Sequence, residues 1–173
     1  MKFIKELVPY IVIIVVVVLI RTFIVTPVQV DGESMYPTLL DNQILILKKY
    51  DHSYDRFDIV VFKYNNSKLV KRVIGLPGET VSYKNNTLYI NDKEIDNIKL
   101  DAYTYDFNLS ELGFDKIPEG YYFVLGDNRT NSLDSRMIGL IPEDSILGVT
   151  NFSVFPFKRF GIIDMVMVWI KRQ

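Results

Sequence analysis

Serine and lysine are the residue types in this chain that could supply a nucleophile and its base. Residues 30–40 read VDGESMYPTLL, which places Ser34 between a glycine turn and a proline turn. A serine hydroxyl is a weak nucleophile unless a neighbouring base takes its proton. The sequence has no cysteine and one histidine, His52, which lies in a polar stretch (KKYDHSYD) with no evident connection to Ser34. Ser34 is therefore either an ordinary turn residue or a nucleophile with an unusual base.

Lys71 is the residue best placed to be that base. Residues 69–74 (LVKRVI) have the pattern of a strand, in which Leu69, Lys71 and Val73 share one face. Apolar neighbours on that face would desolvate the amine and lower its pKa. With an ordinary pKa a lysine is neutral only about 0.04% of the time at pH 7, and a shift of about 2 to 3 units removes most of that penalty. The alternative is a lysine that reaches solvent or pairs with a carboxylate.

A long polar loop occupies residues 126–142 (GDNRTNSLDSRMIGLIP). Its Ser132 offers a hydroxyl that could orient the amine of Lys71, and Asp134 with Arg136 could form an ion pair that braces the loop. The alternative is a solvated surface loop. A calcium-binding loop is disfavoured, because arginines stand among the candidate oxygen ligands and the spacing does not match an EF-hand.

These residues need a rigid framework, and the rest of the chain predicts one made mainly of antiparallel β-strands. Asn85 and Asn86 form a hairpin-turn signal between two of these strands. Residues 101–120 are irregular, and residues 79–120 are expected to form a small inserted β subdomain, or cap. The predicted strands lie at residues 43–47, 58–62, 69–74, 79–83, 87–90, 121–125 and 149–155.

The N-terminal segment, residues 7–25, is expected to be a single transmembrane helix. It is almost wholly apolar, and Arg21 is its only charged residue. A helix over this run is long enough for a hydrocarbon core about 30 Å thick. Lysines precede the run, so residues 1–6 are expected in the cytoplasm and residues 26–173 outside the cell membrane. A buried strand, a cleaved secretory signal and a buried core helix are the alternatives.

Composition limits the remaining possibilities. A chain of 173 residues suggests one domain with a small appendage, and its net charge of −1 disfavours a nucleic-acid-binding role. The absence of cysteine excludes disulfides, thiol catalysis and thiolate metal sites. The tail at residues 162–170 is apolar but too short to span a bilayer. It is expected either as a terminal core strand or as a segment that touches the membrane through Trp169, Lys171 and Arg172.

Four sequence boxes after the apolar N-terminal segment resemble, in order, those of the bacterial type I signal peptidases, which are membrane-bound serine proteases. The boxes are GESMYPTL, DRFDIVVF, VKRVIGLPGE and GDNRTNSLDSR. The resemblance covers nearly the whole chain, and the compact cap is similar to that of Gram-positive members. It implies a mainly β fold, with one transmembrane helix followed by an antiparallel β catalytic core that carries a small inserted β subdomain. It implies no metal and no cofactor.

The resemblance also implies a role for each matching residue. Ser34 would be the nucleophile and Lys71 the general base of a Ser–Lys dyad that forms an acyl-enzyme. Ser132 would hydrogen-bond the lysine, while Asp134 and Arg136 would hold the site together structurally.

The implied oxyanion hole uses the backbone N–H of the nucleophile. Some members add a serine hydroxyl two positions upstream, where this sequence has Gly32, so a backbone group is expected to take that place. The substrate would be an extended chain with small residues, usually Ala, at the first and third positions before the cut, lying along a sheet edge. The residues expected to wall its pockets are Val28, Val30, Met35 and Val70.

The implied function is removal of N-terminal signal peptides from exported preproteins by a membrane-anchored endopeptidase, with membrane lipid and the secretion translocon as further partners. Three alternatives remain. Soluble Ser–Lys autoproteases of the repressor type carry a DNA-binding module where this chain has an apolar segment. A non-catalytic, membrane-anchored homologue that only binds preproteins is disfavoured by the presence of both dyad residues. A microsomal-type peptidase would have histidine where this sequence has Lys71.

Overall fold

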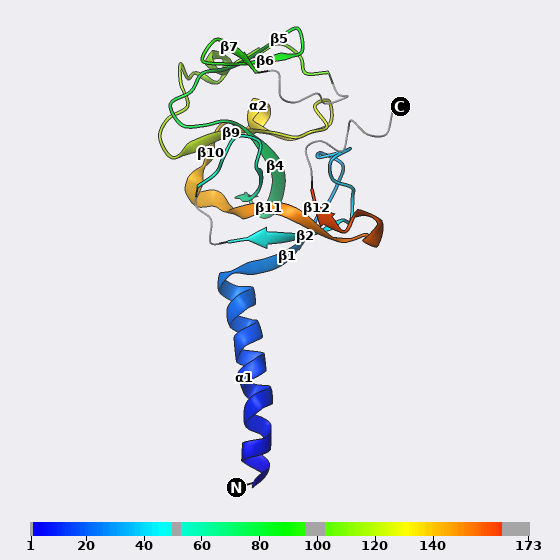
Figure 1. Ribbon diagram of the computed structural model, residues 1–173. Helices are drawn as coiled ribbons and strands as arrows, with labels where there is room; N and C mark the ends of the chain where they lie inside the picture. Colours follow the sequence, from blue (N-terminus) through cyan, green and yellow to red (C-terminus); the bar gives the residue numbers. More distant parts are fainter. Residues whose placement is uncertain (1, 50–52, 96–102, 164–173) are drawn as a thin grey trace.

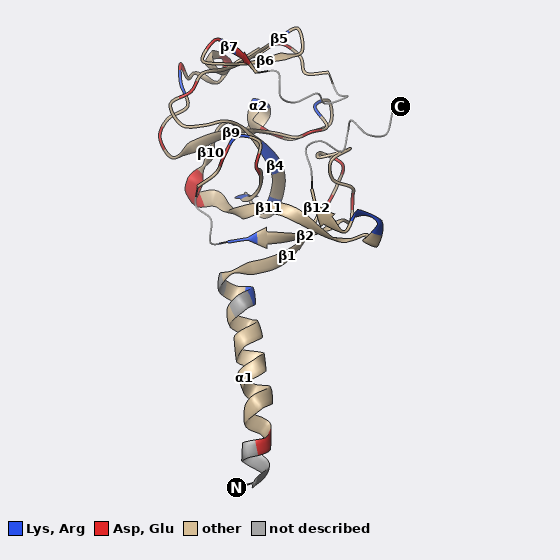
Figure 2. Cartoon of the chain, viewed as in Figure 1, with Lys and Arg blue, Asp and Glu red and all other residues tan. Residues whose placement is uncertain are grey.

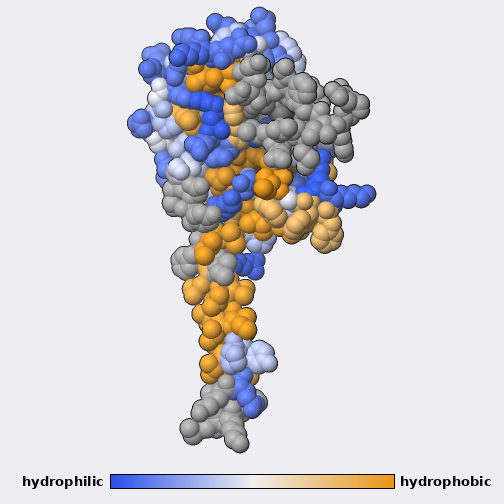
Figure 3. All heavy atoms as spheres, in the orientation of Figure 1, coloured by the Kyte–Doolittle hydropathy of each residue, from blue (hydrophilic) through white to orange (hydrophobic). Residues whose placement is uncertain are grey.

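The computed structural model describes residues 2–49, 53–95 and 103–163 of the chain. A helix, α1 (Lys2–Phe23), projects from a β domain that holds nearly all the remaining elements (Figure 1). α1 ends two residues before the predicted end of the apolar segment, because Val25 already begins strand β1 (Val25–Gln29) and pairs with Lys48. Figure 3 shows the apolar surface along the shaft of α1, where Leu7–Leu19 are described. No helix in the described part of the chain meets the length and hydropathy required to cross a membrane.

One large antiparallel sheet forms the body of the domain, which confirms the prediction of a mainly β fold. Its strands run in the order β1-β2-β11-β3-β4-β9-β10, and β12 pairs with β11. Hydrophobic side chains from these strands fill clusters on both sides of β4, so that its last six residues are buried. Besides β1, the strands are β2 (Ile44–Lys48), β3 (Ile59–Tyr64), β4 (Ser67–Gly75), β9 (Tyr121–Leu125), β10 (Ile141–Pro142), β11 (Ile146–Phe155) and β12 (Gly161–Ile162).

A second, four-stranded antiparallel sheet lies at the end of the domain away from α1 (Figure 1). Its order is β7-β6-β5-β8, with strands β5 (Val81–Lys84), β6 (Thr87–Ile90), β7 (Lys93–Ile95) and β8 (Phe107–Asn108). The predicted hairpin turn between β5 and β6 is confirmed, since Asn85 and Asn86 have φ angles of 48° and 66°. Such left-handed pairs match the twist of a tight hairpin. The assignment of residues 79–120 as a separate cap stays a prediction.

Every strand predicted from the sequence is present; those at residues 87–90 and 121–125 have the predicted bounds, and the others differ by one to three residues at one or both ends. The short helices are α2 (Ser135–Ile138), η1 (Leu109–Leu112), η2 (Glu143–Ser145) and η3 (Phe157–Arg159). The alternatives for the C-terminal tail stay open, because β12 holds only its first residue and residues 164–173 lie outside the described part of the chain. His52 lies outside it as well.

Candidate active site

Ser34 lies in the tight turn that follows β1. Gly32 opens this turn with a φ of +88°, a conformation that glycine adopts without steric strain. The N–H of Gly32 donates to Oδ1 of Asp41 at 2.8 Å. Met35 and Leu39 fasten the other side of the turn, since both are buried and the N–H of Leu39 donates to the carbonyl of Met35. The turn is thus fixed on both sides of Ser34.

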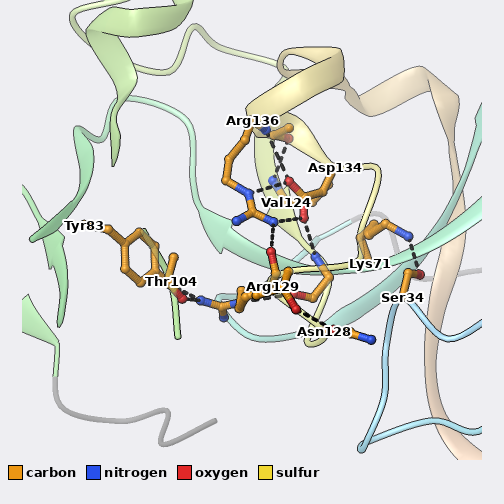
Figure 4. A network of polar contacts seen from close by, with 12 residues as sticks. Ser34, Lys71, Tyr83, Thr104, Val124, Asn128, Arg129, Asp134 and Arg136 are labelled. Carbon is orange, nitrogen blue, oxygen red and sulfur yellow. Dashed lines mark hydrogen bonds and ion pairs between the residues drawn. The ribbon is translucent and has the colours of Figure 1, made fainter. Parts of the chain in front are cut away.

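Lys71 reaches Ser34 from the middle of β4, in register with Val60 on β3. Its Nζ lies 2.7 Å from Oγ of Ser34, with the two side chains pointing toward each other (Figure 4). As an ammonium the lysine donates to this hydroxyl, and as a neutral amine it can accept the hydroxyl proton across the same contact. Nζ also donates to the carbonyl of Val70 at 2.9 Å. The two residues that the sequence singled out as nucleophile and base are therefore in direct contact.

Lys71 is only 2% exposed, and this burial disfavours its charged, protonated form. Burial lowers the pKa of Lys71 from 10.5 to about 8, and the nearby carboxylates of Asp134 and Asp127 oppose that shift. An amine with such a pKa is neutral in about one molecule in ten at pH 7, against about one in a few thousand for an ordinary lysine. A usable fraction of free base is thus present near neutral pH.

The loop that begins at Gly126 holds the backbone of the serine turn. The N–H of Asn128 donates to the carbonyl of Ser34 at 3.0 Å, and its side-chain amide donates to the carbonyl of Glu33 at 3.1 Å. Gly126 packs so closely that an added Cβ would overlap the carbonyl oxygen of Ser34 and Oγ of Ser132. The loop and the turn therefore form one unit.

The predicted ion pair between Asp134 and Arg136 is confirmed. Both carboxylate oxygens of Asp134 accept from the guanidinium, Oδ1 from Nε and Oδ2 from Nη2, each at 2.8 Å. Asp134 is fully buried and also accepts from the N–H of Gly126 at 3.0 Å. The pair ties the far end of the loop back to its start.

A second ion pair was missed by the sequence analysis. Arg72 and Asp127 bind in a bidentate manner at 2.8 and 2.6 Å, with side chains 2% and 0% exposed. The signal was present, because an arginine next to Lys71 in a strand of apolar residues requires a buried anionic partner. The sequence does not say which of several carboxylates that partner is.

Two expected contacts differ in the structure. Oγ of Ser132 is buried without a hydrogen-bond partner among the described residues, so it does not bind Lys71, which instead contacts Ser34 and Val70. The N–H of Gly32 is occupied by Asp41 and does not offer an oxyanion donor. The N–H of Ser34 makes no hydrogen bond within the described ranges and remains available.

A cavity of about 230 Å³ opens beside the serine and the lysine. The predicted wall residues Val28, Val30 and Val70 line it, whereas Met35 does not. Met35 is 1% exposed and packs in the core with Leu39 and Leu45. The lining consists of Pro27, Val28, Gln29, Val30, Asp31, Ser34, Lys68, Leu69, Val70 and Lys71.

The sequence matches known proteins over most of its length. Residues 3–155 match the family model described as signal peptidase, peptidase S26. Signal peptidase I of Bacillus caldolyticus is 43% identical over 169 residues, covering 88% of this chain and 92% of that protein. Signal peptidase IB of Staphylococcus aureus is 42% identical over 178 residues, covering 90% and 93%.

A solved structure is similar as well. The crystal structure of a signal peptidase I from Enterococcus faecalis superimposes with a TM-score of 0.51 at 42% sequence identity. The match covers 56% of this chain and 96% of that one.

Proposed function

Because the chain belongs to the signal peptidase (peptidase S26) family, we propose that it is a membrane-anchored serine endopeptidase that removes N-terminal signal peptides from exported preproteins. The observation that carries the proposal is the 2.7 Å contact between Nζ of Lys71 and Oγ of Ser34. A nucleophile and a base in hydrogen-bond reach, with the base kept largely dry, form the minimum unit of acyl transfer.

The mechanism begins with neutral Lys71 accepting the proton of Ser34 as Oγ attacks the scissile carbonyl. The backbone N–H of Ser34 stabilises the oxyanion, an interaction worth about 3 to 4 kcal/mol for one donor in other enzymes. Lys71 returns its proton to the leaving amine, and the signal peptide stays bound to Ser34 as an ester. Lys71 then takes a proton from water, whose oxygen attacks the ester carbonyl. As the ester C–O bond breaks, Lys71 returns this proton to Oγ of Ser34, which frees the signal peptide and regenerates the enzyme.

The cavity suits a substrate with small side chains. It is lined on one side by residues of β1, an edge strand of the large sheet, and on the other by residues 68–71 of β4. The pairing of β4 with β9 begins only at Arg72, so this part of β4 also has a free edge. An extended peptide can pair with such edges while alternate side chains enter the cavity. The small volume favours residues such as Ala at the first and third positions before the cut.

Membrane anchoring is the further part of the proposal. Its support is the apolar run at residues 7–25 and the exposure of the α1 side chains, for example 60% at Ile13 and 61% at Ile14. An all-apolar helix surface in contact with water is unfavourable, whereas lipid accommodates it. Since no described helix qualifies as a span, this part rests on sequence and exposure alone. The lysines at positions 2 and 5 support a cytoplasmic N-terminus.

The test is cleavage of a signal-peptide-bearing preprotein by the purified full-length protein in detergent, with the new N-terminus read by mass spectrometry. The expected product begins directly after a small-x-small site, and Ser34→Ala yields none. A wild-type protein that binds the preprotein without cutting it would instead identify a non-catalytic homologue.

A further inference from the structure

The second sheet contacts the active-site loop through one buried arginine. Arg129 lies on the loop between Gly126 and Ser132 and is only 5% exposed. Its Nη1 donates to the hydroxyl of Tyr83 on β5 and to Oγ1 of Thr104, each at 2.8 Å. The guanidinium also stacks on the ring of Tyr83, with 5.4 Å between its central carbon and the ring centroid. Figure 4 shows these two side chains meeting Arg129 from the side of the second sheet.

This arginine has no carboxylate partner within the described ranges of the chain. A buried guanidinium held only by neutral acceptors is unfavourable unless its surroundings are well ordered. The acceptors here are well fixed. Thr104 is 1% exposed, and its N–H donates to the side chain of Asn86 at 2.7 Å. Burial raises the pKa of the Tyr83 phenol, which keeps it uncharged and suited to hydrogen-bond the cation.

Arg129 is bonded at the same time to the loop that holds the nucleophile. Its Nε donates to the carbonyl of Gly126 at 3.0 Å, and its own carbonyl accepts from Nη2 of Arg136 at 2.8 Å. Between these two points lies Asn128, whose N–H donates to the carbonyl of Ser34. The guanidinium of Arg129 thus fixes the Gly126 end of the short segment that carries Asn128, and Arg136 fixes its other end.

We propose that Tyr83 and Thr104 are positioning residues for the Ser34–Lys71 pair, acting through Arg129. By holding the guanidinium they fix the segment 126–129, and that segment fixes the carbonyl of Ser34. The second sheet, through Tyr83, and the segment before β8, through Thr104, then support the active site, although neither residue lines the cavity. The inference rests on the proposed function.

The experiment compares hydroxyl deletions that leave shape nearly unchanged, in the full-length protein in detergent. Tyr83→Phe keeps the ring against Arg129, and Thr104→Val keeps the volume of threonine. Thr104→Ser is the conservative rescue, because it retains the hydroxyl. Tyr89→Phe is the matched control, since this tyrosine lies in the same sheet with no hydrogen bond from its hydroxyl among the described residues.

Steady-state cleavage of a preprotein is expected to separate kcat from KM. Tyr83→Phe and Thr104→Val each lower kcat about tenfold with KM changed less than about twofold, because a small displacement of the nucleophile slows chemistry more than binding. Thr104→Ser and Tyr89→Phe stay near wild type. Hydrogen exchange of the peptide covering residues 126–131 is faster in the two deletion variants than in Tyr89→Phe.

The positioning role is overturned if Tyr83→Phe and Thr104→Val both keep kcat within twofold of Tyr89→Phe. It is also overturned if their lower rates are fully explained by a smaller fraction of folded protein. A faster exchange with unchanged kcat overturns it too. A wild-type protein that cuts no preprotein overturns the proposed function, and the positioning role of Tyr83 and Thr104 in catalysis falls with it. The exchange result would then show separately whether the connection to the loop exists.

Discussion

At the scale of single residues, the chemistry depends on the balance of charges around Lys71. Burial disfavours the ammonium form, while Asp134 and Asp127 favour it, and burial dominates. Each carboxylate forms an ion pair with an arginine, Asp134 with Arg136 and Asp127 with Arg72. The positive charge of each arginine offsets part of the attraction between its carboxylate and the ammonium of Lys71. The arginines thus help to keep Lys71 neutral, so under the proposed mechanism both ion pairs support the base.

The pH dependence of cleavage follows from this balance. The reactive form of Lys71 is the neutral amine, so kcat/KM should rise with pH and reach half of its plateau near pH 8, the pKa of Lys71. The measurement is initial-rate cleavage of a preprotein between pH 6 and 10 in buffers of constant ionic strength. A rate that is flat over this range, or that falls as pH rises, would rule out Lys71 as the base.

The stability of the protein should also carry the signature of Lys71. Because its pKa is lower in the folded state, the unfolded chain binds more protons between about pH 8 and 10.5, and stability rises with pH across that window. Keeping Lys71 as an ammonium in the folded protein therefore costs up to about 3 kcal/mol of stability below about pH 8. Lys71→Met removes it, so urea unfolding in detergent should find this variant more stable than wild type at pH 7 by about 1 to 2 kcal/mol. The difference should shrink by pH 10, and a less stable variant at pH 7 would contradict the assignment.

The sequence predicted some residues and contacts of the site but not others. The roles of Ser34 and Lys71 came from motifs, but their contact depends on how the serine turn lies against β4, which is a tertiary property. Asp134 and Arg136 are two positions apart, so their pairing was visible locally. Arg72 and Asp127 are far apart in sequence, and only the fold selects that partner.

At the scale of elements, the site is an assembly of one turn, one strand and one loop. The loop and the turn approach each other closely at Gly126, which packs against both Ser34 and Ser132. A Cβ at this position would meet the backbone carbonyl of Ser34 as well as the side chain of Ser132, so the backbone of the serine turn would have to move. The geometry of the nucleophile therefore depends on the absence of a Cβ there.

Gly126→Ala should accordingly disable the enzyme. The added methyl group pushes the serine turn away from β4, and cleavage is expected to fall by about a hundredfold or more, as for other small displacements of reacting groups. Stability should fall by about 1 to 3 kcal/mol, as for other overpacked sites. Gly113→Asn is a suitable control, because Gly113 has a φ of +82° with open space around it and Asn tolerates that conformation. A Gly126→Ala protein with wild-type activity would refute the close packing.

Strands long enough to show a pattern were predictable, and short ones were not. The apolar run at residues 58–62 and the alternation at residues 69–74 predicted β3 and β4, and Asn85 with Asn86 predicted the hairpin turn. Strands β10 and β12 are two residues long, which is too short for any period to appear. β1 was hidden because its sequence VTPVQ continues the apolar helix run, and pairing with β2 ended the helix there.

At the scale of the whole molecule, the site lies close to the end of α1. The chain passes directly from α1 into β1, whose residues line the cavity, and Figure 2 shows no charged residue along the middle of the helix. Only a short stretch separates Phe23 from Ser34, with a reach of at most about 38 Å. If α1 is an anchor, the active site is held at the membrane surface, where a signal peptide emerges from the bilayer.

Anchoring can be tested in cell fractions. The full-length protein should remain in the membrane pellet after alkaline carbonate extraction. Val15→Arg combined with Val16→Arg should move it to the supernatant, because each charge in the middle of a span costs about 3 kcal/mol. Wild-type protein recovered in the carbonate supernatant would remove the anchor from the proposal and leave the catalytic part intact.

The most direct test of the central claim is single-turnover cleavage of a preprotein at pH 8 by wild type and by Lys71→Met. The variant keeps an unbranched side chain of similar size but cannot accept a proton, so cleavage should slow by about a thousandfold. Circular dichroism should show an unchanged fold. A folded Lys71→Met protein that retains more than a tenth of the wild-type rate would show that Ser34 is activated by some group other than Lys71.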